Sequence, residues 1–385
     1  MLLLTVSLAT AQVPCSPTII PRASLFVNWP QFQYDAAHSG CNPYETILNT
    51  STVSRLQLKW QYQFIQGGYS SGAVADGVIY TGQSASDGVL LAINANTGDL
   101  LWYFSSQYGN FSSPAVANGV VYVGAGDHNI YALNAKTGTM IWQYATGDRI
   151  AGAPTTAKGT VYVGSADNNI YALNAATGVL VWKYTTGGEV DYSPAVANGI
   201  VYSGSADQKI YALDAGTGAL IWNFPTGSAY CSASVANGKV YVGSDQVYAL
   251  DAKTGKLVWN YPAQGSVSPA LANNAVYLTT SGGTAFALNA ATGALIWAHN
   301  MGDNSNIYNS ATVANGVVYA NTNHYFNALD AHTGALLWNF TLEGNSEAAA
   351  GWPVVANGVV YLGSYCLYPF QCGSGYLSVF SLNGE

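Results

Sequence analysis

Hydrophobic residues along this chain fall into short runs that are separated by glycine, asparagine, aspartate and threonine. One stretch shows the pattern well, with runs at residues 113–117, 120–124, 130–135 and 139–144. Each run is rich in β-branched and aromatic side chains and is bounded by turn-forming residues, which is typical of β-strands. The pattern therefore predicts units of four short strands.

A two-residue turn separates the first two runs of each unit. Asn118-Gly119 is a strong hairpin signal, because both residues tolerate a positive φ. The same pair recurs as Asn198-Gly199, Asn237-Gly238, Asn315-Gly316 and Asn357-Gly358, with the variants Asp76-Gly77, Lys158-Gly159 and Asn273-Asn274. The chain therefore contains eight predicted hairpins of one kind.

Tryptophan marks the fourth run of the unit and sets the repeat length. It occurs at intervals of 37 to 42 residues, at Trp60, Trp102, Trp142, Trp182, Trp222, Trp259, Trp297 and Trp338. All but the first follow a Thr-Gly pair, as in Thr137-Gly138 before Trp142. A period near 40 residues with four strands per unit predicts an all-β fold, an eight-bladed β-propeller of four-stranded antiparallel blades.

The two ends of the repeat region complement one another. The first strand, residues 56–64, carries Trp60 but lacks the other three strands of a unit. The last unit, residues 352–382, has three strands but lacks the strand with Thr-Gly…Trp. Together they make the eighth blade, so the N- and C-terminal strands pair and close the ring. We expect the repeated Trp to cover the interface between blades, and the Thr-Gly glycine to take a positive φ.

Composition excludes several classes of protein. Charged residues are 8% of the chain, 11 basic and 19 acidic, against about 25% in an average domain. High hydrophobicity excludes a disordered chain, and so few bases exclude a nucleic-acid binder. No apolar run reaches the ~18 residues that a membrane-spanning helix needs.

The chain ends and cysteines point to an exported protein. Residues 1–11 are apolar and finish in Ala9-Thr10-Ala11, which predicts signal-peptide cleavage after Ala11; the alternative is a hydrophobic N-terminal strand. Residues 12–55 form a non-repeating lead-in segment packed on the propeller, which spans residues 56–385. Export permits disulfides, for which Cys15 with Cys41 and Cys366 with Cys372 are the candidate pairs, leaving Cys231 as a small buried residue.

The unit Ile-Tyr-Ala-Leu-Asn-Ala-x-Thr-Gly-x-x-x-Trp, seen at residues 130–142, resembles the repeat of the pyrroloquinoline quinone (PQQ) repeat family. Residues 29–43 also resemble the lead-in of secreted members. The resemblance implies either a quinoprotein alcohol dehydrogenase, holding PQQ and Ca²⁺ on the axis, or a cofactor-free scaffold similar to the propeller lipoprotein of outer-membrane β-barrel assembly.

The enzyme pattern is poorly met in this sequence. Quinoprotein dehydrogenases place two adjacent cysteines over the cofactor, and this chain has none. The aspartate base and the calcium ligands of those enzymes have no motif here, so a metal site stays unassigned. His38, His128, His299, His324 and His332 are scattered, and we expect them at surface or turn positions rather than in a catalytic set.

Strand alternation sorts the loops onto two faces. The top face holds the outer-to-inner and second-to-third connections, with two bases, Arg149 and Lys209, and the acids Asp87, Asp127, Asp148, Asp167, Glu189, Asp191, Asp207, Asp245, Asp303, Glu343 and Glu347. The bottom face is balanced, with Asp76, Asp99, Asp214, Asp251 and Asp330 against Lys136, Lys158, Lys239, Lys253 and Lys256. A one-signed face steers basic partners, although single loop aspartates are often turn residues.

One column of the inner strands lines the propeller axis. It reads Ser71, Ser113, Ala153, Ser193, Ser232, Ser268, Ser310 and Trp352. The small residues suit a narrow channel, and Trp352 either plugs it or offers a stacking platform for a ligand. Neighbouring top loops complete a candidate ligand pocket with Arg149, Glu189, Asp191, Asn306, Glu347, Tyr365 and Tyr368.

The sequence thus favours a secreted, extracellular or periplasmic module without catalysis and without a cofactor. It would bind a protein, a small molecule or a carbohydrate on its acidic top face. The alternative is a PQQ- and Ca²⁺-dependent dehydrogenase for alcohols or sugars. A third possibility is an assembly or surface-layer component.

Overall fold

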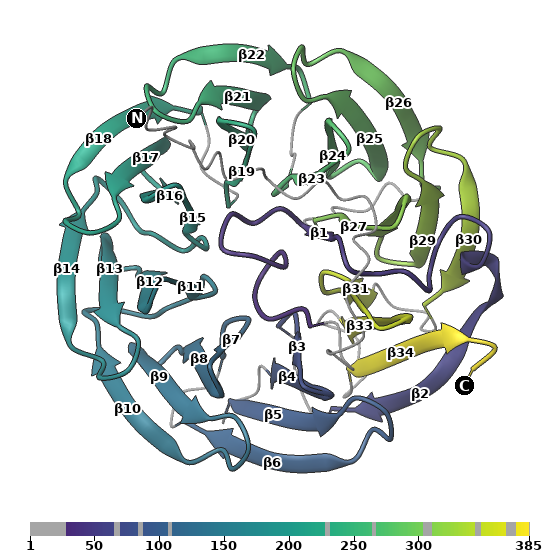
Figure 1. Ribbon diagram of the computed structural model, residues 1–385, viewed down its shortest axis with the longest axis horizontal. Coiled ribbons are helices and arrows are strands. Elements are labelled where there is room, and N and C mark those ends of the chain that lie inside the picture. Colours follow the sequence, from purple (N-terminus) through teal and green to yellow (C-terminus); the bar gives the residue numbers. More distant parts are fainter. Residues whose placement is uncertain are drawn as a thin grey trace, which may run out of the picture.

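The structure is a computed structural model of the chain. It describes residues 28–64, 70–83, 88–106, 110–227, 232–263, 267–302, 310–342, 348–366 and 375–384, without the side chains of 348–350, 365 and 366. Eight antiparallel sheets stand around a central axis, as predicted (Figure 1). Within the described residues, the one helical element is the short 3-10 helix η1 (Val53–Arg55), and no helix is long and apolar enough to cross a membrane.

The first four blades repeat one design, in which an inner three-residue strand is followed by three longer strands. Their strands are β3 (Ala73–Ala75), β4 (Val78–Gln83), β5 (Val89–Asn94) and β6 (Leu100–Ser105); β7 (Ala115–Ala117), β8 (Val120–Gly124), β9 (Asn129–Asn134) and β10 (Met140–Ala145); β11 (Thr155–Ala157), β12 (Thr160–Gly164), β13 (Asn169–Asn174) and β14 (Leu180–Thr185); β15 (Ala195–Ala197), β16 (Ile200–Ser205), β17 (Lys209–Asp214) and β18 (Leu220–Pro225).

Blades five to seven follow the same order, and blade seven gains a strand from the lead-in segment. They consist of β19 (Ser234–Ala236), β20 (Lys239–Gly243), β21 (Val247–Asp251) and β22 (Leu257–Tyr261); β23 (Ala270–Ala272), β24 (Ala275–Thr279), β25 (Thr284–Asn289) and β26 (Leu295–Asn300); β27 (Thr312–Ala314), β28 (Val317–Asn321), β29 (Tyr325–Asp330) and β30 (Leu336–Thr341). The short β1 (Cys41–Asn42) pairs in parallel with β27.

Blade eight joins the two ends of the repeat region, which confirms the predicted closure. It contains β32 (Val354–Ala356), β33 (Val359–Cys366), β34 (Tyr376–Leu382) and, as its outer strand, β2 (Leu56–Gln63). β2 pairs antiparallel with β34, so that Trp60 lies opposite Val379. The unit of residues 352–382 contains the three predicted strands, and the additional short strand β31 (Ala348–Ala350), which precedes the unit, pairs with the far end of β33.

The turns have the predicted backbone conformation. Asn118 and Gly119 have φ values of 52° and 74°, and the other hairpins of this kind also have two positive φ values. The Thr-Gly glycines are positive as well, for example Gly138 at 71°. The repeat is therefore set locally by residues that tolerate the left-handed region.

The repeated Trp closes the interface between neighbouring blades, as predicted. The Trp142 indole donates from Nε1 to the Ala175 carbonyl of the next blade at 3.0 Å, and the Tyr122 hydroxyl donates to the same oxygen at 3.0 Å. The glycine of the next Thr-Gly turn, Gly178, lies against the ring, where a Cβ would come within 2.7 Å of it. The same indole-to-carbonyl bond joins Trp102 to Ala135, Trp182 to Ala215, Trp222 to Ala252, Trp259 to Ala290 and Trp297 to Ala331.

The hydrophobic core lies between adjacent blades rather than in one central mass. One cluster, for instance, combines Tyr122 and Ile130 of blade two with Val161, Val163 and Leu173 of blade three. Each blade thus buries both of its faces against its neighbours, which explains why the strands read as nearly continuous apolar runs.

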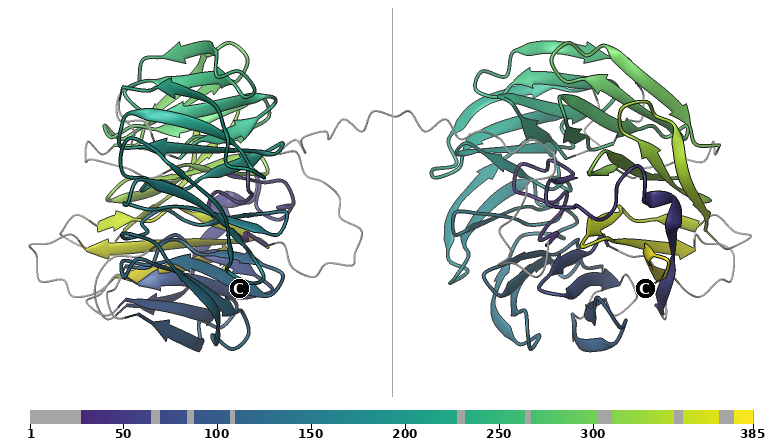
Figure 2. Two further views of the ribbon diagram at one scale, coloured as in Figure 1. Left: turned by 90° about the vertical axis from the view of Figure 1, so that its left-hand side faces the viewer. Right: turned by 45° about the vertical axis from the view of Figure 1, so that its right-hand side comes forward.

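The lead-in segment occupies the axis, a position that the sequence did not predict. Residues 29–42 cross the centre of the ring in Figure 1, and Figure 2 shows them lying toward one flat face. They bond to the inner strand of every blade in turn, through the pairs Trp29 and Val74, Pro30 and Val116, Gln31 and Thr156, Ala36 and Val196, Ala37 and Val235, Ser39 and Leu271, Gly40 and Val313, and Asn42 and Val355.

His38 lies at the centre of this segment, at the end of a turn in which its backbone N–H donates to the Asp35 carbonyl at 3.0 Å. Of the predicted surface or turn position, the turn is confirmed, whereas the residue is fully buried and not at the surface. Its Nδ1 lies 3.2 Å from the Ala233 carbonyl of blade five, and its Nε2 lies 3.0 Å from the Thr155 hydroxyl of blade three. Because a carbonyl only accepts, Nδ1 carries the proton and the neutral ring accepts from Thr155. Burial lowers the pKa of His38 to about 3.

Candidate functional site

A cavity of about 600 Å³ lies on the axis and is lined by the column that the sequence singled out. Each column residue comes two positions before its inner strand, as Ser193 does before β15. The lining residues are Ser113, Ala151, Gly152, Ala153, Asp191, Tyr192, Ser193, Ser232, Val267, Ser268, Ser310 and Trp352. This axial pocket is the candidate functional site.

The serines of the column bond the inner strands to one another. The backbone N–H of Ala153 donates to the Ser193 hydroxyl at 2.9 Å, and that of Ser193 donates to the Ser232 hydroxyl at 3.0 Å. Ser232 continues the series to Ser268 at 3.0 Å. At these three positions the serine is both small and the acceptor of a hydrogen bond from the neighbouring inner strand, whereas the sequence had indicated only the small size.

Trp352 takes the same place in blade eight and joins the pocket to the lead-in segment. Its backbone N–H donates to the Ser71 hydroxyl at 3.1 Å. Its ring packs edge-to-face on Phe32, with centroids 4.7 Å apart, and Phe32 in turn contacts His38. The axis beneath Trp352 is thus filled by the lead-in segment, while the role of Trp352 as a stacking platform stays a prediction.

Three of the predicted top-loop residues come together at the rim of the pocket. Arg149, between β10 and β11, lies with Nη2 2.9 Å from Glu189 and 2.6 Å from Asp191, which both lie between β14 and β15. The Asp191 side chain is 26% exposed, against 47% for Arg149. Hydrogen bonding to Asp191 raises the pKa of Arg149, and burial raises that of Asp191 although Arg149 opposes the change.

Several polar atoms of the pocket residues are buried without a partner in the described part of the chain. They are the Ser310 hydroxyl, Nε1 of Trp352 and Oδ1 of Asp191. Leaving such a group unpaired costs about 1–3 kcal/mol. Within the described residues, the pocket lining therefore includes unsatisfied donors and an unsatisfied carboxylate oxygen.

Tyr192 lines the pocket and was missed by the sequence analysis. It stands between Asp191 and Ser193, which the sequence analysis did select. In the described blades, the residue directly before the column position is aromatic only here. Comparing the position one before each column residue would have singled it out.

The remaining predicted site residues cannot be placed. Asn306, Glu347 and Tyr368 lie outside the described residues. Tyr365 is placed only through its backbone in β33, which pairs with Ala349 of β31. Cys41 is buried in β1, whereas Cys15, Cys231 and Cys372 lie outside the described residues. Both disulfides therefore stay predictions.

Two of the repeated top-loop aspartates, Asp167 and Asp207, each accept more than one hydrogen bond at their turns. Asp167 accepts a hydrogen bond from the Tyr171 hydroxyl and from the Gly147 and Asn169 backbone N–H groups. Burial alone would raise its pKa, but these bonds lower it overall, and the same holds for Asp207 with Tyr211. Within the described residues, no group of three or more His, Cys, Asp or Glu side chains is placed to hold a metal ion.

Comparison with known proteins agrees with this architecture. Residues 49–153, 146–231 and 227–367 match the PQQ-repeat family described as outer membrane protein assembly factor BamB. No curated protein matches the sequence.

Solved structures show the same fold at low sequence identity. Quinohemoprotein alcohol dehydrogenase from Comamonas testosteroni has a TM-score of 0.78 at 18% identity, over 93% of this chain and 81% of that one. BamB from Moraxella catarrhalis has a TM-score of 0.70 at 18% identity, over 85% and 99%. The computationally designed protein Ika8 has 0.70 at 20%, over 81% and 96%. The family match covers most of the chain, and the protein therefore belongs to the PQQ-repeat propeller family of the outer membrane protein assembly factor BamB.

Proposed function

We propose that this protein is a secreted or periplasmic binding module without catalysis, which receives a basic segment of a partner protein on its top face. The observation that carries the proposal is that both basic side chains of the top face are paired with acidic ones. Arg149 is paired with Glu189 and Asp191, and Lys209 lies 3.4 Å from Asp207. Neither base is left to attract an acidic partner.

The acids outnumber these bases within the described loops. They are Asp127, Asp148, Asp167, Glu189, Asp191, Asp207 and Asp245. The bottom loops carry equal numbers of acids and bases. A face of one sign concentrates cations near it and accelerates association with a basic partner. The Moraxella catarrhalis relative is named BamB, and the family is named for outer-membrane protein assembly, which supports a periplasmic scaffold.

A labelled decalysine peptide tests the face directly. We expect it to bind at low salt and to be released as salt rises, because the attraction is screened. The double variant Asp148→Asn/Glu189→Gln removes two exposed top-face charges and is expected to weaken binding about fivefold at low salt.

The matched control removes two bottom-face charges with Asp76→Asn/Asp99→Asn. Both residues are exposed, so the net charge of the protein changes equally. Fluorescence anisotropy should show binding close to wild type. Equal weakening by the two double variants would mean that net charge alone, and not the top face, attracts the peptide.

The alternative function is a PQQ- and Ca²⁺-dependent dehydrogenase, which the likeness to the Comamonas testosteroni enzyme favours at the level of fold. The described lining fits this cofactor poorly. PQQ carries three carboxylates, yet the lining supplies Asp191 and no Lys or Arg, and the nearby Arg149 is bound to two carboxylates. Incubation with PQQ and Ca²⁺ followed by a dye-linked alcohol oxidation assay is expected to give no turnover, and turnover would overturn the proposal.

A further inference from the structure

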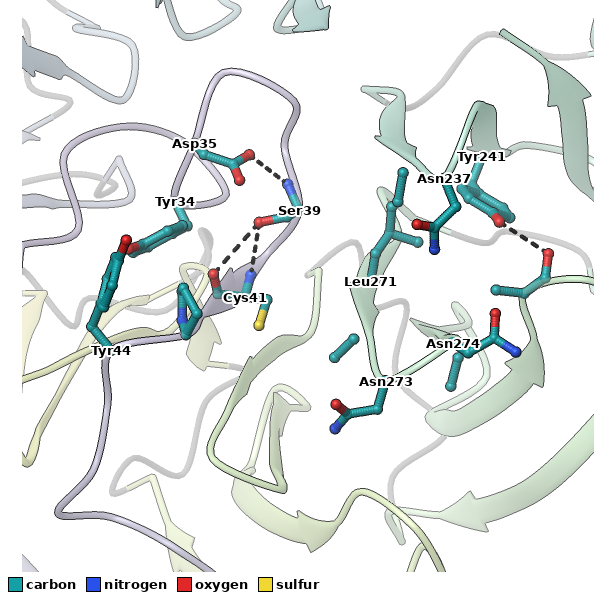
Figure 3. A pocket seen from close by; sticks show the side chains of 15 residues that line it. Tyr34, Asp35, Ser39, Cys41, Tyr44, Asn237, Tyr241, Leu271, Asn273 and Asn274 are labelled. Carbon is teal, nitrogen blue, oxygen red and sulfur yellow. Dashed lines mark hydrogen bonds between the residues drawn. The ribbon is translucent and has the colours of Figure 1, made fainter. Parts of the chain in front are cut away.

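A second cavity, of about 410 Å³, opens between the lead-in segment and the hairpins of blades five and six. Figure 3 shows Tyr34, Asp35, Ser39, Cys41 and Tyr44 of the lead-in segment on one side. Asn237, Tyr241, Leu271, Asn273 and Asn274 of the two blades face them from the other side. Because the hairpins lie on the bottom face, this cavity is separate from the axial pocket.

The lead-in side contributes aromatic rings and one carboxylate. Tyr34 is held by an edge-to-face contact with Trp29, with centroids 5.3 Å apart. Tyr44 is anchored by its backbone N–H, which donates to the Asn42 side chain at 3.0 Å. Asp35 accepts the Ser39 backbone N–H at 2.9 Å, which fixes the carboxylate beside the rings.

The blade side contributes side-chain amides from the two hairpins. Asn274 stands where the equivalent hairpins have glycine, and it adopts a φ of 60°. A Cβ at the equivalent Gly119, Gly159, Gly199 or Gly238 would meet nothing within 4 Å, so glycine is used there for its conformation and not for space. Asparagine tolerates this region better than most residues with a side chain. At Asn274 the hairpin therefore keeps its conformation and also places an amide in the cavity wall.

The remaining lining sets the charge and polarity of the cavity. The Tyr241 hydroxyl donates to the Ala290 carbonyl at 2.9 Å and is used in the interface between blades. Leu271 and several alanines supply apolar surface, and the described lining includes no Lys, Arg or His. The cavity therefore offers amides, hydroxyls and one carboxylate next to aromatic rings, without a cation.

We propose that this cavity is a binding site for a neutral saccharide. Amides donate and accept at once, as sugar hydroxyls do, and a carboxylate accepts strong hydrogen bonds from hydroxyl groups. The apolar C–H face of a sugar ring packs on an aromatic ring. The described lining has no cation to attract an anion, and a purely apolar ligand would leave the Asn274 amide desolvated. The volume is within the range of small-ligand sites.

The decisive variant is Asn274→Gly, which restores the glycine of the equivalent hairpins. It removes the amide, and glycine adopts the positive φ freely, so the variant is expected to fold as well as wild type. A printed array of neutral glycans identifies a binder, and titration calorimetry with that glycan measures affinity. We expect binding by wild type and about tenfold weaker binding by Asn274→Gly and by Tyr44→Ala.

The matched control is Asn118→Gly, which removes an exposed amide with φ of 52° from a hairpin in blade two, away from the cavity. It should bind the glycan as wild type does. Absence of any neutral glycan binding by wild type, or unchanged binding by Asn274→Gly, would overturn the proposal. The proposal would also be overturned if wild type bound decalysine but no glycan, and if Asn274→Gly lost the decalysine binding. That result would show that the cavity binds a cation.

Discussion

The rim and the centre of this propeller hold neighbouring blades together in different ways. At the rim, one contact is repeated: an indole and a tyrosine hydroxyl donate to one alanine carbonyl, as Trp182 and Tyr162 do to Ala215. At the centre, residues 29–42 bond to the blades through contacts that differ from one blade to the next, and blades three and five are each contacted more than once. The rim contact is therefore redundant, whereas no central contact is repeated around the ring.

The difference shows where the molecule tolerates change. The repeated rim contact is interrupted on both sides of blade eight: within the described residues, the Tyr319 hydroxyl at the junction of blades seven and eight and Trp60 Nε1 at the junction of blades eight and one are buried without a partner. Blade eight lacks the Thr-Gly turn, and an aromatic group of Phe326, Trp338, Phe340 and Phe380 packs between blades seven and eight instead. The ring thus closes even where the repeated contact is incomplete.

The largest effect is expected at the centre, from Phe32→Ala. Phe32 is 3% exposed between His38 and Trp352, so truncation leaves a cavity on the axis. We expect a loss of about 3–5 kcal/mol in the free energy of unfolding, measured by guanidinium denaturation. Tyr103→Ala, at a 66% exposed rim residue, is the control and should change stability by less than about 0.5 kcal/mol. Equal stabilities of the two variants would show that the centre contributes nothing.

Two glycines with positive φ allow the effect of packing against the rim indole to be distinguished from the effect of backbone conformation. Gly178→Ala would place a Cβ 2.7 Å from the Trp142 ring, whereas Gly199→Ala meets nothing within 4 Å. We expect losses of about 3 kcal/mol and about 1 kcal/mol respectively in thermal or denaturant unfolding. The same loss at both positions would mean that the indole moves freely and does not hold the interface.

His38 makes the centre sensitive to pH. In the folded protein its pKa is about 3, whereas the unfolded ring takes up a proton below about pH 6.5. The unfolded state therefore binds more protons as pH falls, and stability decreases from pH 6.5 toward 3. Between pH 7 and 5 we expect a loss of about 2 kcal/mol that His38→Gln does not show. Parallel pH profiles for the two proteins would contradict a neutral, buried His38.

The smallest effects compare a complete rim contact with an incomplete one. The Tyr202 hydroxyl donates to the Ala252 carbonyl at 3.0 Å, so Tyr202→Phe should cost about 1 kcal/mol. Tyr319→Phe removes a buried hydroxyl that has no partner among the described residues, and it should leave stability unchanged or slightly higher. A clear loss in Tyr319→Phe would reveal a partner for this hydroxyl.

The candidate site was partly predictable from the sequence. Arg149, Glu189 and Asp191 were grouped because equivalent loops of neighbouring blades share one end of the sheets, and the structure joins them by ion pairs. Trp352 was recognised because it interrupts a column of small residues. Its contact with Phe32 was not predictable, since the two residues belong to segments without a shared period.

The amino-acid sequence by itself determined the fold and the rim, because each blade repeats the same turns, strands and indole, and local conformation determines them. Only the tertiary structure decided how the lead-in segment lies. His38, for example, bonds across 195 positions to Ala233 and across 117 positions to Thr155, and no local pattern encodes such a contact. The periodic part of the chain is therefore readable from spacing, whereas the non-periodic part depends on the ring that forms around it.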